Sequence, residues 1–408
     1  MSERIANLDV LRGFALLGLP LMNIIVFSMP FGAYLNPMAY AGDSALNHVV
    51  FSFLFVFADQ KFMNLFCLLF GASIALLAEK LIQKKGAAAG SFYGRMVLLL
   101  MIGVCHFWFI WEGDILMFYA IVGMVSFLFY RLPASVLGTL AAIALAGSVW
   151  LHWQSDVDLD SMPPEAAQEI INFYHPSSEH TETYRQAMLG CYSDVMGATS
   201  RSEGSESEET PEFFMFLLHF LCAVLLKIAG LMWLGMALYK SGLLQGRKPA
   251  ATYKRLAISS LSVGYVITVA TLYSNYAADW HFNHFFEYSL ALTTIGSIAI
   301  SIGYMALINL SLIRTLNSPL QRWLSPVGKM ALTNYLTQSI VCALLFYGYG
   351  FGLWGELNRL QLMLIALTIG LFQIGLSTLW LRVFAQGPVE WLWRSVNQLK
   401  LSPILAQR

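Results

Sequence analysis

Charge is scarce in this sequence: charged residues make up 12% of its 408 residues, against 57% hydrophobic residues. A soluble globular chain carries roughly twice that charged fraction. The few charged residues also avoid long stretches of sequence, which a surface in contact with water would not allow. The sequence therefore predicts that a lipid bilayer surrounds most of the protein.

An excess of either charge is also missing, since 24 Lys and Arg residues balance 24 Asp and Glu residues. Without a basic tail or a long basic run, nucleic acid is not expected as a partner, because phosphate binding needs concentrated Lys and Arg. The five cysteines do not resemble a disulfide framework. Four lie in apolar segments, where a thiol is usually a small core side chain, and Cys191 stands alone in a polar loop.

Several catalytic signatures are absent as well. The sequence has no Walker loop, no His-Glu-x-x-His, no paired Cys-x-x-Cys and no Gly-x-Ser-x-Gly elbow. ATP-driven transport, a zinc hydrolase and a serine hydrolase are therefore unsupported. The histidines are not spaced to bind haem or metal, so we expect no metal site.

Long apolar runs, in contrast, are abundant. They are much longer than barrel strands and do not alternate strictly, so they predict an all-α, polytopic transmembrane bundle. The whole chain, residues 1–408, is expected to form one integral membrane domain. The first run lacks a small-x-small cleavage site and is interpreted as a retained helix rather than a signal peptide. About ten spans are expected, at residues 10–29, 57–80, 95–112, 115–131, 134–153, 212–238, 255–275, 287–310, 329–347 and 360–383.

Basic residues gather in alternate connections, which indicates the orientation of the bundle. If the N-terminus is inside, the connections assigned to the outside hold only Arg185, Arg201 and Arg359. The pattern therefore predicts that both termini are cytoplasmic.

The one large hydrophilic insertion, residues 154–211, is acidic and is expected outside. Ser161-Met-Pro-Pro-Glu165 is typical of a helix start, with Ser161 as the cap. The tract 199–210 is of low complexity. The insertion is interpreted either as a solvated loop or as a substrate-binding lid.

Ionisable groups inside spans are functional candidates, because each costs about 2.5 kcal/mol or more when unpaired. On the first helix, Asp9 and Arg12 share a face, and Asn23 returns to nearly the same face eleven residues after Arg12. This stripe either anchors the inner end of the helix and joins helices, or lines an interior cavity.

Two further groups of polar residues lie on other spans. Lys61 and Asn64 share a face near the predicted outer end of the second span, where Lys61 either snorkels as an anchor or enters a site. Lys227 lies well inside the sixth span and is expected to face the bundle. Asn334 and Gln338, four residues apart in the ninth span, either meet such groups or join helices by hydrogen bonds.

The sharpest candidate is His106, about a turn and a half inside the third span, with Glu112 and Asp114 in the outside turn that follows. A desolvated histidine oriented by a carboxylate is typical of a general base. Two simpler interpretations compete with this one. His106 is then only a packing residue, and Asp114 is only the N-cap of the fourth span.

Five segments carry a resemblance to a known family. They are Leu8-Asp-Val-Leu-Arg-Gly13, Lys61-Phe62…Leu69-Phe70-Gly71, His106…Gly113-Asp114-Ile115-Leu116, Gly328-Lys-Met-Ala-Leu-Thr-Asn-Tyr-Leu336 and Gly387-Pro-Val-Glu-Trp-Leu-Trp-Arg394. With these motifs the chain resembles, nearly from end to end, the YeiB family of bacterial inner-membrane proteins. That family is similar to the wider transmembrane acyltransferase superfamily, which includes bacterial O-acyltransferases and heparan-glucosaminide N-acetyltransferases.

The resemblance implies transfer of an acyl group from acyl-CoA, as cosubstrate, to the hydroxyl or amine of a small-molecule acceptor at or across the inner membrane. In the O-acyltransferase branch, an arginine early in helix 1 is followed eleven residues later by the catalytic histidine. Here Arg12 matches, but Asn23 stands in the place of that histidine, as in the glucosaminide branch. His106 is then the best replacement, with Asp114 or Glu112 stabilising its imidazolium.

On this interpretation Arg12 faces the negatively charged coenzyme A from the cytoplasm. The residues expected to hold the cosubstrate are Arg12, Asp9, Asn23, Lys61, Asn64 and Lys227. A rival hypothesis is a transporter or exporter of a small polar metabolite, with interrupted helices and a binding site around Lys227 at mid-membrane. A third is a structural protein whose polar groups only join helices, and a homo-oligomer is compatible with any of them.

Overall fold

The computed structural model describes residues 6–40, 44–154, 159, 162–190, 211–314, 318–398, 400–401 and 403–405. Within these ranges the protein is helical, apart from one isolated bridge between Phe384 and Leu405, which confirms the predicted all-α class. Its helices are α1 (Ala6–Gly18), α2 (Pro20–Ser28), α3 (Gly32–Leu35), α4 (Ala45–Phe57), α5 (Lys61–Lys85), α6 (Ala89–Phe109), α7 (Leu116–Phe127), α8 (Ala134–Trp153), α9 (Pro164–Tyr174), α10 (Ser178–Met188), α12 (Pro211–Lys240), α13 (Ala250–Ala277), α14 (Phe282–His284), the π-helix η1 (Phe285–Ser289), α15 (Leu290–Arg314), α16 (Pro319–Lys329), α17 (Ala331–Phe346), α18 (Arg359–Val383) and α19 (Pro388–Gln398).

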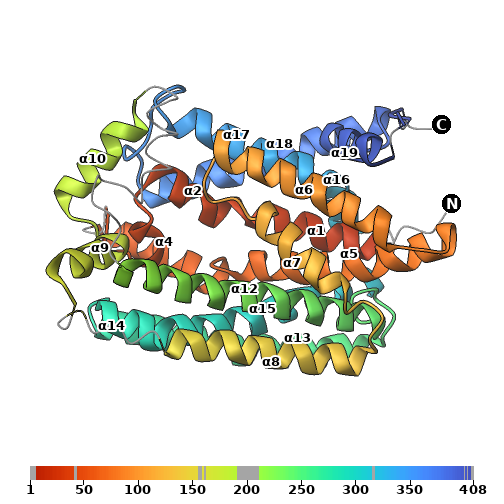
Figure 1. Ribbon diagram of the computed structural model, residues 1–408, viewed down its shortest axis with the longest axis horizontal. Coiled ribbons are helices and arrows are strands. Elements are labelled where there is room, and N and C mark those ends of the chain that lie inside the picture. Colours follow the sequence, from red (N-terminus) through yellow and green to blue (C-terminus); the bar gives the residue numbers. More distant parts are fainter. Residues whose placement is uncertain are drawn as a thin grey trace.

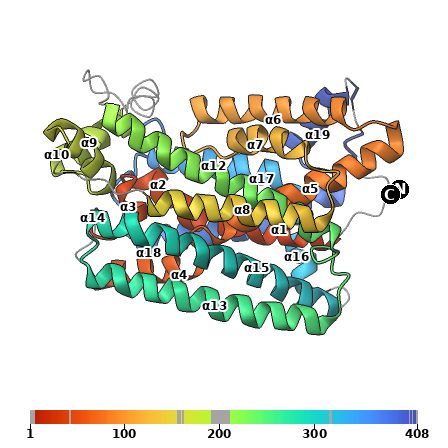
Figure 2. The ribbon, with the colours of Figure 1, turned by 60° about the horizontal axis from the view of Figure 1, so that its bottom comes forward.

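Eight helical stretches in the described ranges are long and apolar enough to cross a membrane, and α7 and α17 are shorter apolar helices. The protein is therefore a polytopic membrane protein, while the count of ten spans stays a prediction. Figure 2 shows α6 and α7 on one side of the bundle and α13 on the other. Helix α8 packs along α12, and α13 packs along α15.

The two ends of the bundle differ (Figure 1). The start of α1 and the C-terminal helix α19 lie at one end, whereas α9 and α10 lie at the opposite end. Termini at a common end agree with an even number of spans, and their cytoplasmic side stays a prediction. Helix α9 begins at Pro164, and Ser161 and the tract 199–210 lie outside the described residues. We refer to α9 and α10 together as the α9–α10 cap.

The second predicted span shows the largest difference from the structure. It was expected to begin at residue 57, but two helices, α4 and α5, are separated here by the turn 58–60. No Gly or Pro marks this turn in the sequence. Instead Gln60 takes the left-handed conformation (φ 59°), which is uncommon for a residue with a Cβ. The break therefore could not be found from the usual sequence signals.

Helices α5 and α12 cross at very short range because a glycine on each helix faces the backbone of the other helix. A Cβ on Gly71 would lie 2.0 Å from the carbonyl oxygen of Met232, and a Cβ on Gly235 would lie 1.9 Å from that of Leu68. Small residues at such crossings let transmembrane helices pack closely. This crossing brings Lys227 of α12 against the start of α5.

Candidate functional site

His106 and Asp114 form a buried pair in the bundle. His106 lies in the last turn of α6, and Asp114 lies in the connection that leads into α7. The imidazole Nδ1 is 2.9 Å from Asp114 Oδ1, and neither side chain is accessible to solvent. The structure thus brings together the histidine and carboxylate that the sequence singled out, and their catalytic role stays a prediction.

The second carboxylate oxygen of Asp114 makes the contact expected of a helix N-cap, which was the alternative interpretation of this residue. Oδ2 accepts a hydrogen bond of 2.7 Å from the backbone N–H of Met117, in the first turn of α7. Gly103 on α6 makes room for this contact, because a Cβ there would lie 2.9 Å from Oδ2 and 2.6 Å from the Met117 nitrogen. One carboxylate therefore caps a helix and also holds the imidazole in place.

Glu112 has a different setting. Its Oε1 accepts a hydrogen bond of 3.2 Å from the hydroxyl of Tyr184, on α10 of the α9–α10 cap. Burial, and then the negative charge of Glu112, raise the pKa of Tyr184 well above its usual value, so the phenol remains a donor. The carboxylate at ion-pair distance from His106 is Asp114, and Glu112 connects the same turn to the α9–α10 cap.

The polar stripe of the first helix is divided between two places. Arg12 forms an ion pair of 3.1 Å with buried Asp9 and donates a 2.6 Å hydrogen bond to Ser73 on α5. Asn23, on α2, instead lines a cavity of about 100 Å³. Arg12 and Asn23 therefore do not meet, and the stripe both joins helices and lines a cavity.

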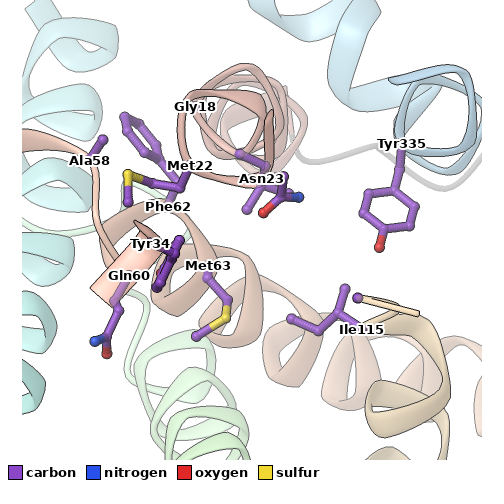
Figure 3. A pocket seen from close by; sticks show the side chains of 12 residues that line it. Gly18, Met22, Asn23, Tyr34, Ala58, Gln60, Phe62, Met63, Ile115 and Tyr335 are labelled. Atoms are coloured by element: carbon purple, nitrogen blue, oxygen red, sulfur yellow. The ribbon is translucent and has the colours of Figure 1, made fainter. Parts of the chain in front are cut away.

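This cavity, which we call the central cavity, is lined by several parts of the fold (Figure 3). Its walls come from α1–α2, from Tyr34 of α3, from the turn between α4 and α5 with the start of α5, from the residues on either side of Asp114, and from α17. Tyr335 of α17 is buried. The backbone N–H of Ile115 faces its hydroxyl oxygen, and the O–H has no hydrogen-bond acceptor in the described part of the chain. Figure 3 shows this hydroxyl directed towards the space beside Ile115, and the Asn23 amide turned to the same side.

His106 lies directly behind this wall. The centroid of its ring is 5.3 Å from that of Tyr335, and neither of its ring nitrogens has a hydrogen-bond partner among the described residues, Nδ1 being at ion-pair distance from Asp114. Gly113 and Ile115, the neighbours of Asp114, line the cavity themselves. The pair is therefore one side chain removed from the cavity.

The break between α4 and α5 holds the buried lysines. Lys61 is fully buried and donates to the carbonyl of Phe55 near the end of α4, so its interpretation as a snorkelling anchor is wrong. Lys227 is also buried and donates to the side chain of Gln60, a residue that lines the central cavity. A cation at the carbonyl end of α4 is favourable, because that helix end carries partial negative charge.

The remaining polar predictions join helices. Asn64 donates a 2.9 Å hydrogen bond to Ser297 on α15. Asn334 donates a hydrogen bond of 2.9 Å to Ser377, and Gln338 donates one of 2.7 Å to a glutamine; both acceptors lie on α18. Asn334 and Gln338 thus contact α18, and within the described residues their side chains do not bond to Lys227.

Sequence reasoning did not single out four residues of this region. Asp59 accepts a 2.6 Å hydrogen bond from Tyr34, and Gln60 and Tyr335 line the cavity with Tyr34. The string Asp59-Gln60-Lys61 was visible as a polar interruption between apolar runs. Tyr34 and Tyr335 gave no such signal, because tyrosine is common in apolar helices and near membrane surfaces.

The two C-terminal motifs meet at the start of α17. Glu390 of α19 accepts hydrogen bonds from the backbone N–H groups of Leu332 and Thr333, at 2.7 and 3.1 Å. A carboxylate at a helix N-terminus satisfies free donors and complements the helix dipole. This contact fixes the first turn of α17, and Tyr335 lies directly after that turn.

Comparison with known proteins gives the family. Residues 238–400 match a family described as "Protein of unknown function (DUF418)". The chain is 29% identical to "Uncharacterized protein YeiB" of Escherichia coli (strain K12), over 99% of both chains. It is 30% identical to "Uncharacterized protein YxaH" of Bacillus subtilis (strain 168), over 99% of this chain and 96% of the relative. The chain belongs to the YeiB family. A third relative of this YeiB-family chain, from Bacillus acidopullulyticus, is 26% identical over 100% of this chain and 98% of the relative.

Proposed function

We propose that this YeiB-family member is a membrane acyltransferase in which His106 is the general base. The observation that carries the proposal is the 2.9 Å His106–Asp114 pair, buried directly behind the wall of the central cavity. Buried polar groups in an intramembrane bundle mark functional sites more often than surface groups do. A histidine oriented by a carboxylate is the usual arrangement for moving a proton at neutral pH.

In this proposal the proton of the acceptor hydroxyl or amine passes to Nε2 of His106. Neither ring nitrogen has a hydrogen-bond partner among the described residues, and Nδ1 is the one at ion-pair distance from Asp114. Asp114 stabilises the imidazolium through Nδ1. The cosubstrate acyl-CoA supplies an activated thioester, so the new C–O or C–N bond replaces a C–S bond. The proton held by His106 then returns to the leaving sulfur, which balances the reaction.

The size of the central cavity limits what it holds. About 100 Å³ is well below the 300–1,000 Å³ of sites for drug-sized ligands, so it suits a short acyl group or a small acceptor and not a whole coenzyme. Neither Arg12 nor His106 lines it. A route for the acyl group from the Arg12 end to the His106 end therefore stays part of the proposal.

The test is acyl transfer from radiolabelled acetyl-CoA by the purified full-length protein in nanodiscs, with a panel of small hydroxyl and amine acceptors. His106→Ala is expected to lower the rate about 10²- to 10⁴-fold. His180→Ala, on the exposed surface of α10, is the matched control and should keep the wild-type rate. Transfer at the wild-type rate by His106→Ala would exclude His106 as the base.

A second candidate function, a transporter of a small polar metabolite, is favoured by one observation. The α4–α5 pair is an interrupted helix with Lys61 and Lys227 buried beside the break, and binding sites of secondary transporters are often built this way. Solute flux into proteoliposomes that needs Lys227 and consumes no acyl-CoA would favour this function over the enzyme.

A further inference from the structure

Helix α5 begins in the interior of the bundle. The turn before it lies beside the middle of α15, because Tyr304 donates a 2.9 Å hydrogen bond to the carbonyl of Phe57. Helix α5 then runs 25 residues towards the end of the bundle that holds the termini. Its N-terminus is therefore at depth in the membrane, where water is scarce and free backbone donors are costly.

That N-terminus has donors without acceptors. No side chain caps it, and Gln60 at the cap position turns its own amide to Lys227. The backbone N–H groups of Lys61 and Asn64 have acceptors within the turn, but those of Phe62 and Met63 have none among the described residues. Phe62 and Met63 both line the central cavity.

The charges beside this helix end are unbalanced. Lys61 and Lys227 interact electrostatically with each other and with a single carboxylate, Asp59, which gives a formal charge of +1. In the described part of the chain neither ammonium is within 4.0 Å of a carboxylate oxygen. The positive end of the α5 dipole adds to this potential.

An independent feature on the opposite wall also indicates a ligand. Tyr335 is 3% exposed. The backbone N–H of Ile115 faces its hydroxyl oxygen, but the O–H itself has no hydrogen-bond acceptor in the part of the chain described here. The hydroxyl is directed into the cavity (Figure 3). Buried polar groups in folded proteins nearly always have a partner, so a donor left free at a cavity wall indicates a bound molecule.

We propose that the central cavity binds a small organic anion, whose carboxylate or phosphate lies at the N-terminus of α5 and whose body extends towards Tyr335. The backbone N–H groups of Phe62 and Met63 donate to the oxyanion, as at other helix N-termini that bind anions. Lys227 balances its charge. The site goes beyond acyl transfer, because it needs no acyl-CoA to form.

The test is isothermal titration of the full-length protein in nanodiscs with sodium acetate, inorganic phosphate and, as the neutral analogue, acetamide. Wild type is expected to bind at least one oxyanion and not acetamide. Binding of acetate alone indicates a carboxylate ligand, and binding of phosphate alone indicates a phosphate monoester. Failure of both oxyanions to bind would overturn the proposal, whatever the outcome of the acyl-transfer assay.

Two substitutions should move the affinity in opposite directions. Lys227→Met removes a charge at similar side-chain length and is expected to weaken oxyanion binding about tenfold or more. Asp59→Asn still accepts the hydrogen bond of Tyr34 but removes the only carboxylate of the cluster, so it should tighten binding about threefold or more. The matched control is Lys240→Met, on the same helix but bonded to carbonyls of residues 130 and 132, and it should leave the affinity unchanged. Equal affinity in wild type and Lys227→Met, or weaker binding by Asp59→Asn, would refute the site.

Discussion

The two roles of Asp114 can be separated by one substitution, Asp114→Asn. In the wild type Oδ2 caps α7 at the N–H of Met117, and Oδ1 lies 2.9 Å from His106 Nδ1. Asparagine has one oxygen and one NH₂ group in these places. If its oxygen keeps the cap, the NH₂ group faces Nδ1. That ring nitrogen must then be an acceptor, which moves the imidazole proton to Nε2 and removes the free base.

The expected magnitudes follow from this geometry. Asn is about as good an N-cap as Asp, so Asp114→Asn should change the free energy of unfolding by less than about 0.5 kcal/mol, whereas Asp114→Ala should cost about 1 kcal/mol. Because the imidazole can be neutral, Asp114→Asn leaves no unpaired buried charge. The rate of acyl transfer, in contrast, should fall about 10²- to 10⁴-fold, the usual contribution of a positioned general base.

Two measurements on the same samples check this prediction: thermal unfolding in detergent and single-turnover transfer of a labelled acetyl group. Stability close to wild type together with a large loss of rate supports the pair as the proton carrier. A rate within about twofold of wild type would reduce Asp114 to a helix cap and remove the main support for His106 as the base. A loss of stability of about 2 kcal/mol or more in Asp114→Asn would contradict the assigned capping geometry.

Three further predictions concern the fold. Glu390→Ala removes the acceptor at the start of α17 and should cost about 2 kcal/mol of stability, measured as a lower unfolding midpoint. Gly328→Ala places a Cβ 1.9 Å from a carbonyl oxygen of α1 and should strongly reduce the yield of folded protein, whereas Gly138→Ala, with open space around it, should not. Cysteines introduced at Glu179 and Lys248 should react with a membrane-impermeant maleimide from opposite sides of the membrane, Glu179→Cys from outside. Labelling of both from one side would contradict the predicted orientation.

The sequence located the His106–Asp114 pair because both residues are short-range features. They are eight residues apart, on either side of one turn between two apolar helices, so the connection itself keeps them close. The caps and the apolar lengths of most spans are local in the same sense. Features of this kind can be predicted without knowing how distant helices pack.

The depth of Lys61 could not be predicted in this way. Its neighbours suggested a position near the end of a span, and the break that buries it depends on Gln60 in a left-handed conformation. Nothing local favours that conformation in glutamine. The contacts of this turn come from distant helices: Lys227 on α12 donates to Gln60, and Tyr304 on α15 donates to the carbonyl of Phe57. The partners of Asn334 and Gln338 on α18 are distant for the same reason.

The buried lysines and the His106–Asp114 pair lie behind the walls of the same cavity, since their sequence neighbours Gln60, Phe62, Gly113 and Ile115 or their contact residues line it, and this bears on what the acceptor is. An ionisable group in the membrane interior costs several kcal/mol unless it is paired, so Lys227 without a carboxylate in contact is expensive in a protein that moves only neutral groups. An acceptor that carries its own carboxylate or phosphate balances this charge at the α5 end of the cavity. Its hydroxyl or amine then lies on the Tyr335 side, next to His106. We therefore combine the two proposals into one site. The lysine end orients an anionic acceptor, and His106 at the other end takes the proton of the acceptor's hydroxyl or amine.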